Sequence, residues 1–510
     1  MKKHKNQFLT FSLIVFVSIS FNQCKKTNIK IVGKFSQETV NNYQEHCAFC
    51  HGKDKLGKMG PALLPGNLKR LRKSKAQDVI LNGRIATQMP AFKRKLNKEE
   101  IQDLVKYIYA PLSQVPVWGK KEINDTRIVH YTYDSLGDTP TFKADMMNLF
   151  LVVELAEHHI TVLNGDTFNS IHRFKTRFAL HGGPKFTSNG RYVFMASRDG
   201  WVSKFDIYNL KTTHEIRAGI NTRNLAVSHD GKYVMAGNYL PHNVVILSAK
   251  DLSIVKIIPM ESLRYNKTSR VSAVYSAPPR KSFIIALKDL KQIWEISYDK
   301  PSFPISKILV DDYLDDFSFA NKFKLVIGAS RTALNGIVIN MDEGKKIAEV
   351  ELPGMPHLGS GITWKYKKTT VLATPNLKTG EVSIIDTKTW KTIKKIKTLG
   401  PGFFMRSHEK TPYAWVDVFF GPNKNAMHII DKKTLKIIKT LRPAPKNKTV
   451  AHVEFTKDGK YALVSVWDND GAVIVYNAKT LKEVKRISMR KPSGKYNVYN
   501  KVTRSTGTSK

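Results

Sequence analysis

The spacing of apolar residues changes character near residue 137 of this 510-residue chain. Upstream of that point, apolar positions recur at the spacing of a helix that buries one face, as at Ile101, Leu104, Val105 and Ile108. The pattern predicts helices over 40–47, 76–82 and 98–109, the last of them capped by Asn97. Residues 38–112 are therefore predicted to form a small all-α domain.

From residue 137 to the C-terminus, short β-rich runs alternate with turns. A strand–turn–strand motif recurs around Asn189-Gly190, Asp230-Gly231 and Asp458-Gly459, and the first two glycines are 41 residues apart. A second turn motif begins at Asp386, Asp431 and Asn477, at intervals of about 45 residues. Repeats of this length predict an all-β propeller of four-stranded blades, and residues 137–510 have room for about eight. Residues 113–136 are predicted to be a linker.

The segment Cys47-Ala48-Phe49-Cys50-His51 reads C-x-x-C-H, the attachment motif of a c-type haem. Each thiol can form a thioether to a haem vinyl group, and the imidazole of the following residue can bind the iron. A zinc half-site normally needs further ligands at similar spacing, and the chain has only one other cysteine, Cys24. A redox dithiol would not need the histidine. The motif predicts covalent haem c, with Cys47 and Cys50 as attachment residues and His51 as an iron ligand.

The segment Gln88-Met89-Pro90-Ala91-Phe92 resembles the sixth-ligand loop of small class I cytochromes c. The resemblance implies that the Met89 thioether is the second axial ligand, and Met59 is the competing candidate. A lone methionine usually fills a core, so the loop context carries this assignment. A Met/His pair raises the haem potential and suits electron transfer.

The chain is strongly basic, with 83 Lys and Arg residues against 42 Asp and Glu residues and a net charge of +41. Such a charge is compatible with nucleic-acid binding, but the lysines are scattered and no helix-turn-helix, zinc-finger or RRM motif is present. Nucleic acid is therefore not an expected partner. A basic surface favours acidic protein partners, anionic lipid head groups or ligands that carry carboxylates.

The first 24 residues have the layout of an export signal. Lys2, Lys3 and Lys5 precede an apolar run over 8–21, which is too short for a confident transmembrane span. Cys24 then stands where bacterial lipoproteins carry their lipid, although the residues before it depart from the usual small-residue motif. We expect a periplasmic protein, anchored to a membrane if Cys24 is lipidated.

The propeller region resembles the haem d1 domain of the cytochrome cd1 group. The resemblance rests on short segments along the region and on the tail Lys491–Asn500, which reads KPSGKYNVYN. Together with the cytochrome c domain it covers nearly the whole chain after residue 24. The group contains dissimilatory nitrite reductases and also enzymes that make haem d1, among them a dihydro-haem d1 dehydrogenase with its own c-type domain. Haem d1, or its dihydro precursor, is the ligand that the resemblance implies.

Histidine positions separate the branches of this group. His181 matches the proximal ligand of haem d1. Nitrite reductases place two histidines on the distal side, and His357 matches one of them. The position of the other histidine is occupied by Asp315 in this chain, so nitrite reduction is in doubt.

His452 matches the distal histidine of the dehydrogenase, which oxidises a propionate side chain to an acrylate. A neutral imidazole near its ordinary pKa would be a suitable base for that step. Arg198 and Arg223 match basic residues that hold the carboxylates of the macrocycle. His408 also matches a histidine of the group, without a role that the sequence assigns. An ordinary packing histidine is the alternative at each of these positions.

The sequence thus favours a haem-dependent oxidoreductase that resembles the dihydro-haem d1 dehydrogenase, with electrons passing to haem c. His452 and His357 are its expected catalytic residues. The alternatives are a cytochrome cd1 nitrite reductase with Asp315 in place of a proton donor, and a d1-binding electron-transfer protein without catalysis. The expected partners are an external electron-transfer protein and d1-maturation proteins.

Overall fold

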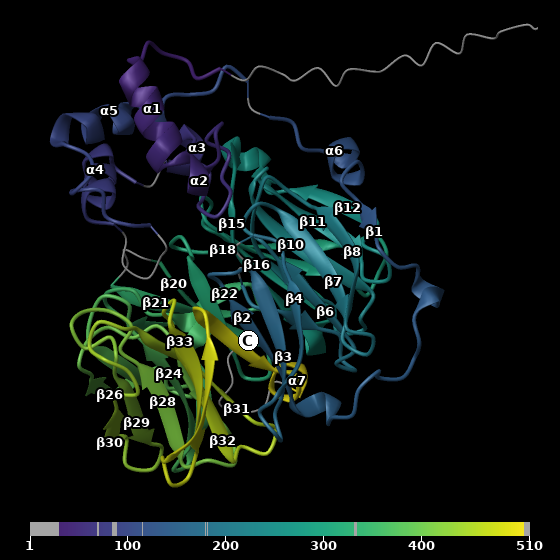
Figure 1. Cartoon of the computed structure of the whole chain (residues 1–510), viewed down its shortest axis with the longest axis vertical. Coiled ribbons are helices and arrows are strands. Elements are labelled where there is room, and N and C mark those ends of the chain that lie inside the picture. The colour runs from purple at the N-terminus through teal and green to yellow at the C-terminus, as the bar shows by residue number, and fades with distance from the viewer. Residues whose placement is uncertain are drawn as a thin grey trace, which may run out of the picture.

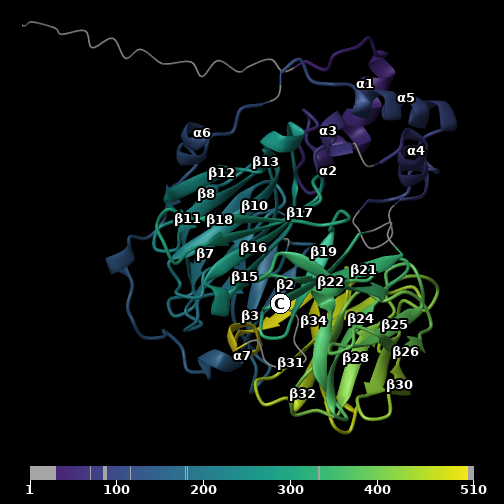
Figure 2. The same cartoon turned by 180° about the vertical axis from the view of Figure 1, so that it is seen from behind.

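The computed structural model describes residues 30–68, 71–83, 89–114, 116–178, 180, 182–330 and 334–503. A small helical domain at the N-terminal end lies against one side of a large β-propeller, as both views show (Figures 1 and 2). The predicted export signal and Cys24 lie outside the described residues. No helix among the described residues has the length and apolarity to cross a membrane.

The helical domain confirms the predicted all-α unit. Its longest helix begins at a capping box, in which the Asn97 side chain accepts from Glu100 N and the Glu100 carboxylate accepts from Asn97 N. Apolar side chains from its helices form one core. The helices are α1 (Gln37–His46), α2 (Ala48–His51), α3 (Pro65–Leu68), α4 (Lys73–Asn82) and α5 (Lys98–Tyr109).

The propeller has the eight blades that the repeats predicted, and in the part of the chain that the structure describes seven have four strands and one gains a short fifth strand at its outer edge. Its cores lie between neighbouring blades. The first four blades in chain order are β5 (Lys185–Phe186), β6 (Tyr192–Ala196), β7 (Trp201–Asp206), β8 (Lys211–Arg217); β9 (Asn221–Val227), β10 (Tyr233–Leu240), β11 (Asn243–Ser248), β12 (Ile254–Pro259); β15 (Val271–Ala277), β16 (Ser282–Leu287), β17 (Gln292–Ser297), β18 (Ile305–Leu309); and β19 (Asp316–Ala320), β20 (Leu325–Ala329), β21 (Asn335–Asn340), β22 (Lys345–Glu351).

The last four blades continue in the same order, and the final strand closes the ring by pairing with β2 near the start of the propeller. They are β23 (Ile362–Tyr366), β24 (Thr369–Pro375), β25 (Glu381–Asp386), β26 (Thr392–Lys397); β27 (Met405–Ser407), β28 (Tyr413–Asp417), β29 (Met427–Asp431), β30 (Lys436–Leu441); β31 (Val450–Phe455), β32 (Tyr461–Val466), β33 (Gly471–Asn477), β34 (Glu483–Met489); and β35 (Pro492–Asn497), β2 (Leu149–Glu154), β3 (His159–Asn164), β4 (Ser170–Lys175).

The two repeated motifs form two kinds of turn. The Asn/Asp-Gly turns join the first and second strands of a blade, and their glycines have positive φ, 73° at Gly190 and 69° at Gly231. The Asp/Asn turns join the third and fourth strands. Oδ1 of Asp386 accepts from the two backbone N–H groups at 388 and 389, and Asn477 accepts in the same way at 479 and 480.

The segment predicted as a linker also contains secondary structure. The short helix α6 (Lys120–Asn124) packs against β8 and β12, and β1 (Ile128–Val129) pairs with the edge of β8. The turns η1 (Tyr133–Ser135) and η2 (Met146–Asn148) lead into β2. This segment therefore follows the outside of the propeller. The remaining short elements are β13 (Glu261–Ser262), η3 (Leu263–Tyr265), β14 (Lys267–Thr268), η4 (Pro278–Arg280), η5 (Leu358–Ser360) and α7 (Val498–Thr503).

An apolar contact holds the helical domain on the propeller. Ala62 and Leu64 pack with Ile220 and Leu240 of the second blade in one cluster. Polar contacts flank it, because Arg270 donates to the carbonyl of residue 67 and Asn221 Nδ2 donates to the Gly60 carbonyl at 3.5 Å. The haem-attachment motif is thereby placed over the propeller end that carries the loops after β10 and β12.

Candidate functional site

The C-x-x-C-H motif begins a new helix at the end of α1. Cys47 N donates to Tyr43 O at 2.9 Å, and His51 N donates to Cys47 O at 2.9 Å, so one helical turn spans the motif. Burial raises the pKa of Cys47 to about 12 and also raises the pKa of Cys50. A redox dithiol needs a lowered thiol pKa, so the two cysteines do not have the environment of such a pair.

The His51 imidazole is oriented for metal binding through one nitrogen. Its Nδ1 donates to the Pro61 carbonyl at 2.8 Å, which leaves Nε2 as the available ligand atom. Burial lowers the pKa of His51, which favours the neutral, ligating form. Met89 packs against the apolar cluster that contains Cys47. His51 and Met89 therefore remain the predicted iron ligands.

A chain of contacts at the centre of the propeller leads to His357. The Tyr275 hydroxyl of β15 donates to Asp316 Oδ1 at 3.2 Å, and Gly359 N donates to Asp316 Oδ2 at 2.6 Å. His357 Nε2 lies 3.9 Å from the same Oδ2. His357 Nδ1 donates to the Phe403 carbonyl at 2.6 Å. Residues from the third, fourth, fifth and sixth blades thus meet around one imidazole.

Aromatic rings continue from His357 to His452. The ring centroids of His357 and Phe403 are 4.2 Å apart, those of Phe403 and Phe404 are 4.5 Å apart, and those of Phe404 and His452 are 4.9 Å apart. The His452 ring then lies 5.4 Å from that of Tyr496 in β35. The two histidines predicted as catalytic therefore belong to one cluster around the propeller axis.

His452 has an unusual backbone conformation. It is the extra residue of a β-bulge, because Ala451 pairs with Ser465 and Val453 pairs with Val464, and its φ is +51°. A residue with a side chain disfavours this left-handed region by ~1–2 kcal/mol. Surrounding contacts hold the conformation, since His452 N donates to Asp417 Oδ2 at 3.2 Å and Lys495 Nζ donates to His452 O at 2.6 Å. Strain of this kind is typical of functional positions.

The electrostatics of His452 differ from the sequence-based expectation of an ordinary pKa, which was wrong. Burial lowers the pKa of His452 well below its usual value, and Lys495, Arg406 and Lys501 lower it further. The imidazole is therefore neutral at physiological pH. Lys495 N donates to His452 Nδ1 at 3.5 Å, the outer limit for a hydrogen bond, so this contact weakly favours the tautomer with hydrogen on Nε2.

Comparisons with known proteins agree with this geometry. Residues 144–501 match the family model of the cytochrome D1 heme domain, and residues 37–108 match that of cytochrome C oxidase, cbb3-type, subunit III. The chain belongs to the cytochrome d1 haem domain family. A dihydro-heme d1 dehydrogenase from Pseudomonas aeruginosa is 52% identical over 469 residues, which are 92% of this chain and 94% of the relative.

Two further relatives place the chain within the cytochrome d1 family. A solved structure of dihydro-heme d1 dehydrogenase NirN in complex with DHE has a TM-score of 0.79 and 51% sequence identity, and the match covers 91% of this chain and all of that one. A nitrite reductase from Stutzerimonas stutzeri is only 23% identical, over 90% of this chain and 91% of its own length. The predicted resemblance to the dehydrogenase branch is confirmed.

The cofactor predictions follow from this family membership. The cytochrome c domain implies covalent haem c, and the residues fit it, because two free thiols and a preoriented His51 lie on one helical turn. The d1 haem domain indicates binding of haem d1 or its dihydro form. Two guanidinium groups beside the central cluster, Arg223 and Arg406, suit a ligand that carries several carboxylates. Lys495 and Lys501 also lie there, but burial lowers the pKa of Lys501 to about 7 and that of Lys495 well below its usual value.

A backbone hydrogen bond connects the segments that carry the two predicted carboxylate-binding arginines. Thr222 N, next to Arg223, donates to the Arg198 carbonyl at 3.3 Å. Arg223 Nε donates to Ser272 O at 3.2 Å, and its charge acts on His357. Their role toward the ligand stays a prediction. His181, the predicted proximal ligand, lies outside the described residues, so its assignment also stays a prediction.

Asp315, which replaces a nitrite-reductase histidine, is committed to an ion pair. It is buried, and its carboxylate lies 2.5 Å from Lys288 Nζ. The neighbouring Asp316 is the carboxylate that faces His357. A carboxylate that neutralises a buried ammonium is poorly suited to deliver protons.

Sequence reasoning missed several residues of the central cluster. Tyr496 stands within the tail that carried the family resemblance, and Arg406 precedes His408 by two residues, so both could have been found there. Asp417 gave only a weak indication, as a carboxylate within an apolar strand. His408 is buried beneath the last Asp-Gly turn, where a Cβ on Gly459 would lie 2.3 Å from its Nδ1. It has a packing position rather than one in the cluster.

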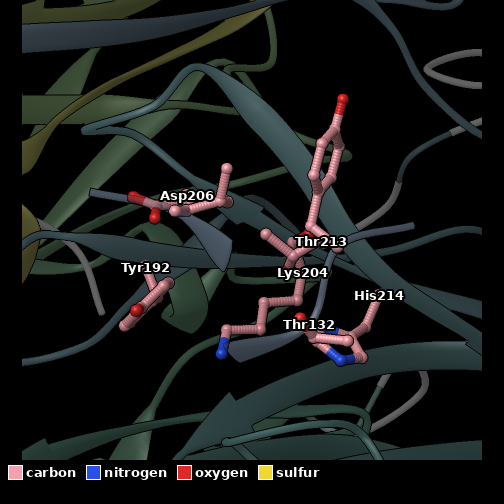
Figure 3. A pocket seen from close by; sticks show the side chains of 8 residues that line it. Thr132, Tyr192, Lys204, Asp206, Thr213 and His214 are labelled. Atoms are coloured by element: carbon pink, nitrogen blue, oxygen red, sulfur yellow. Dashed lines mark hydrogen bonds between the residues drawn. The ribbon is translucent and has the colours of Figure 1, made fainter. Parts of the chain in front are cut away.

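A separate cavity lies beside the first blade, where Lys204, Asp206 and His214 face it (Figure 3). Burial lowers the pKa of Lys204 to about 8 and that of His214 to about 4. The cavity measures only about 10 Å³, which is room for about one water molecule. It therefore has no capacity for an organic substrate.

Proposed function

We propose that this protein is a dihydro-haem d1 dehydrogenase, which oxidises a propionate side chain of the d1 precursor to an acrylate. The observation that carries the proposal is the position of His452, held in a strained bulge within one cluster with His357. The 52% identity to a dihydro-heme d1 dehydrogenase over 92% of the chain supports it.

The reaction removes two electrons and two protons from adjacent carbons, turning a C–C single bond into a double bond. To accept a proton at Nε2, neutral His452 takes the tautomer that carries hydrogen on Nδ1 and gives up the long contact from Lys495 N. The lowered pKa of His452 keeps it unprotonated, and the Arg406 guanidinium stabilises the negative charge that develops on the side chain as the proton leaves. His357, whose Nδ1 donates to Phe403 O, presents Nε2 as the acceptor of the second proton.

Haem c, when attached, supplies a one-electron acceptor, so each substrate molecule requires two successive transfers through it. Cys47, Cys50 and His51 hold that acceptor over the propeller. Phe49 of the motif contacts Phe178 of the propeller, with ring centroids 6.0 Å apart, so the motif touches the d1 domain directly. An external electron-transfer protein would reoxidise the acceptor.

An exported, periplasmic location suits covalent haem attachment and the predicted signal, and lipidation of Cys24 would add an anchor.

The alternative activity, nitrite reduction, has less support. Asp315 is paired with Lys288, and the matched nitrite reductase is only 23% identical. A d1 carrier without catalysis would not need a neutral imidazole in a strained bulge.

The test uses protein that carries haem c and comes from a host unable to make d1. Dihydro-haem d1 is added under anaerobic conditions with ferricyanide as terminal acceptor, and the d1 spectrum is followed. We expect conversion to haem d1 together with transient haem c reduction, and a rate lower by at least ~10²-fold in His452→Ala. Binding without conversion would favour the carrier, and nitrite turnover by d1-loaded protein would refute the dehydrogenase assignment.

A further inference from the structure

Asp417 is a fully buried carboxylate at the end of β28 whose hydrogen bonds all come from backbone groups. Its Oδ1 accepts from Phe403 N at 2.7 Å and from Phe404 N at 3.0 Å. Its Oδ2 accepts from His452 N at 3.2 Å. The backbone N–H of Asp417 donates in turn to Phe404 O at 3.2 Å.

These bonds connect Asp417 to both candidate catalytic histidines. The bond to His452 N holds the residue whose φ is +51°. The bonds to Phe403 and Phe404 fix the loop between β26 and β27, and Phe403 O accepts from His357 Nδ1. One side chain therefore fixes the bulge that carries one imidazole and the carbonyl that orients the other.

We propose that Asp417 is a positioning residue that sets the distance and orientation of His452 and His357 relative to each other. The inference rests on the proposed function for its catalytic consequence, but its structural part concerns the protein alone. A carboxylate offers two oxygens with about four acceptor sites, so it can bridge three N–H groups from two blades. A hydroxyl or an amide at this position could not satisfy all three.

The burial of this charge argues against a merely incidental role. An ionised carboxylate is costly to bury unless it is well paired. Burial raises the pKa of Asp417 to about 6, while the three backbone bonds and Arg406 oppose the increase. The other groups that face it are His452, which is neutral, and Lys495, whose pKa burial lowers well below its usual value. The carboxylate is thus ionised at neutral pH and gains a proton as the pH falls through about 6.

The first experiment uses Asp417→Asn in protein that carries haem c but no d1. An amide has one acceptor oxygen, so it must release either the loop or the bulge. We expect hydrogen exchange at the amides of Phe403, Phe404 or His452 to accelerate by about tenfold or more. The control is Asp386→Asn, because Asp386 also accepts two backbone N–H groups but Asn477 already occupies the same turn position in another blade.

The second measurement follows dihydro-haem d1 oxidation. We expect Asp417→Asn to lower kcat by about tenfold or more with little change in KM, because binding groups remain while the imidazoles move. The acidic limb of the wild-type pH profile near pH 6 should be lost in the variant. Unchanged amide exchange in the variant, or an unchanged kcat and pH profile, would overturn the proposal.

Wild-type protein keeps the idea testable if the variant fails to fold. Protonation of Asp417 weakens its acceptor oxygens, so protection of the three amides, after correction for intrinsic exchange, should fall between pH 7 and 5. Constant protection would overturn the proposal. Absence of substrate oxidation by the wild type would count against the proposed function alone, since both exchange measurements need no substrate.

Discussion

Replacing Gly60 with alanine tests whether the helical domain fixes the His51 ring by close contact. A Cβ at this position would lie 2.6 Å from His51 Cε1, 2.8 Å from Nδ1 and 3.1 Å from Nε2. Gly60 does not have positive φ, so the backbone tolerates alanine and the strain is purely steric. The ring must therefore move, and its 2.8 Å bond to Pro61 O must lengthen.

The size of the effect follows from two opposing contributions. Overpacking a buried contact costs ~1–3 kcal/mol. Replacing glycine by alanine returns ~0.4–1 kcal/mol by restricting the unfolded chain. We therefore expect Gly60→Ala to lower the free energy of unfolding of the helical domain by ~1–2 kcal/mol. The haem c reduction potential should shift as well, because it depends on the axial ligand and its hydrogen bonds.

The assay is guanidinium unfolding followed by haem c absorbance, together with redox titration. Gly66→Ala is the matched control, because a Cβ there would meet no atom within 4 Å. We expect the control to keep the wild-type potential and to raise the free energy of unfolding by ~0.4–1 kcal/mol, because it has the unfolded-chain effect without the steric contact. The reasoning fails if Gly60→Ala behaves like Gly66→Ala in both measurements.

Two further predictions concern pH and the domain contact. Burial lowers the pKa of His214 and His428 to about 4, so below pH 6.5 the unfolded chain binds protons that the folded protein does not. Stability should fall by ~1.6 kcal/mol per histidine from pH 6.5 to 5, measured by urea unfolding, and a double His→Asn variant should lose this part of the dependence. Phe178→Leu removes the ring against Phe49 and should slow haem c reduction by bound substrate about tenfold in stopped-flow traces, and an unchanged rate would contradict a coupling role.

Periodicity and spacing predicted the architecture because each blade repeats the same pattern of strands and turns. The Asn/Asp-Gly turns and the Asp/Asn turns satisfy their own backbone groups, so their residues are readable from short motifs. The helix over 98–109 was found with its exact bounds because both its apolar face and its capping box are local. The helices over 40–47 and 76–82 were placed correctly, but their structured ranges are 37–46 and 73–82.

The central cluster was only partly predictable because its contacts join distant blades. His357 and His452 were identified by family resemblance, and the structure brings them together through Phe403 and Phe404. The bulge at His452 depends on Asp417 and Lys495, which no local pattern connects to it. The lowered pKa of His452 comes first from burial among neighbouring blades. The predicted linker contained a helix and an edge strand that only the propeller stabilises.

The pairing of β35 with β2 has a consequence for how the protein is made. Lys495 and Tyr496 lie in the last strand, and both contact His452 in the preceding blade. The ring and the surroundings of His452 are therefore completed in the same event, after the C-terminal residues have been synthesised and have met the first strand of the propeller. A chain cut short before Pro492 lacks both, so it remains an open ring with an incomplete site. The last strand must therefore be made and paired before the protein can act on a reactive tetrapyrrole.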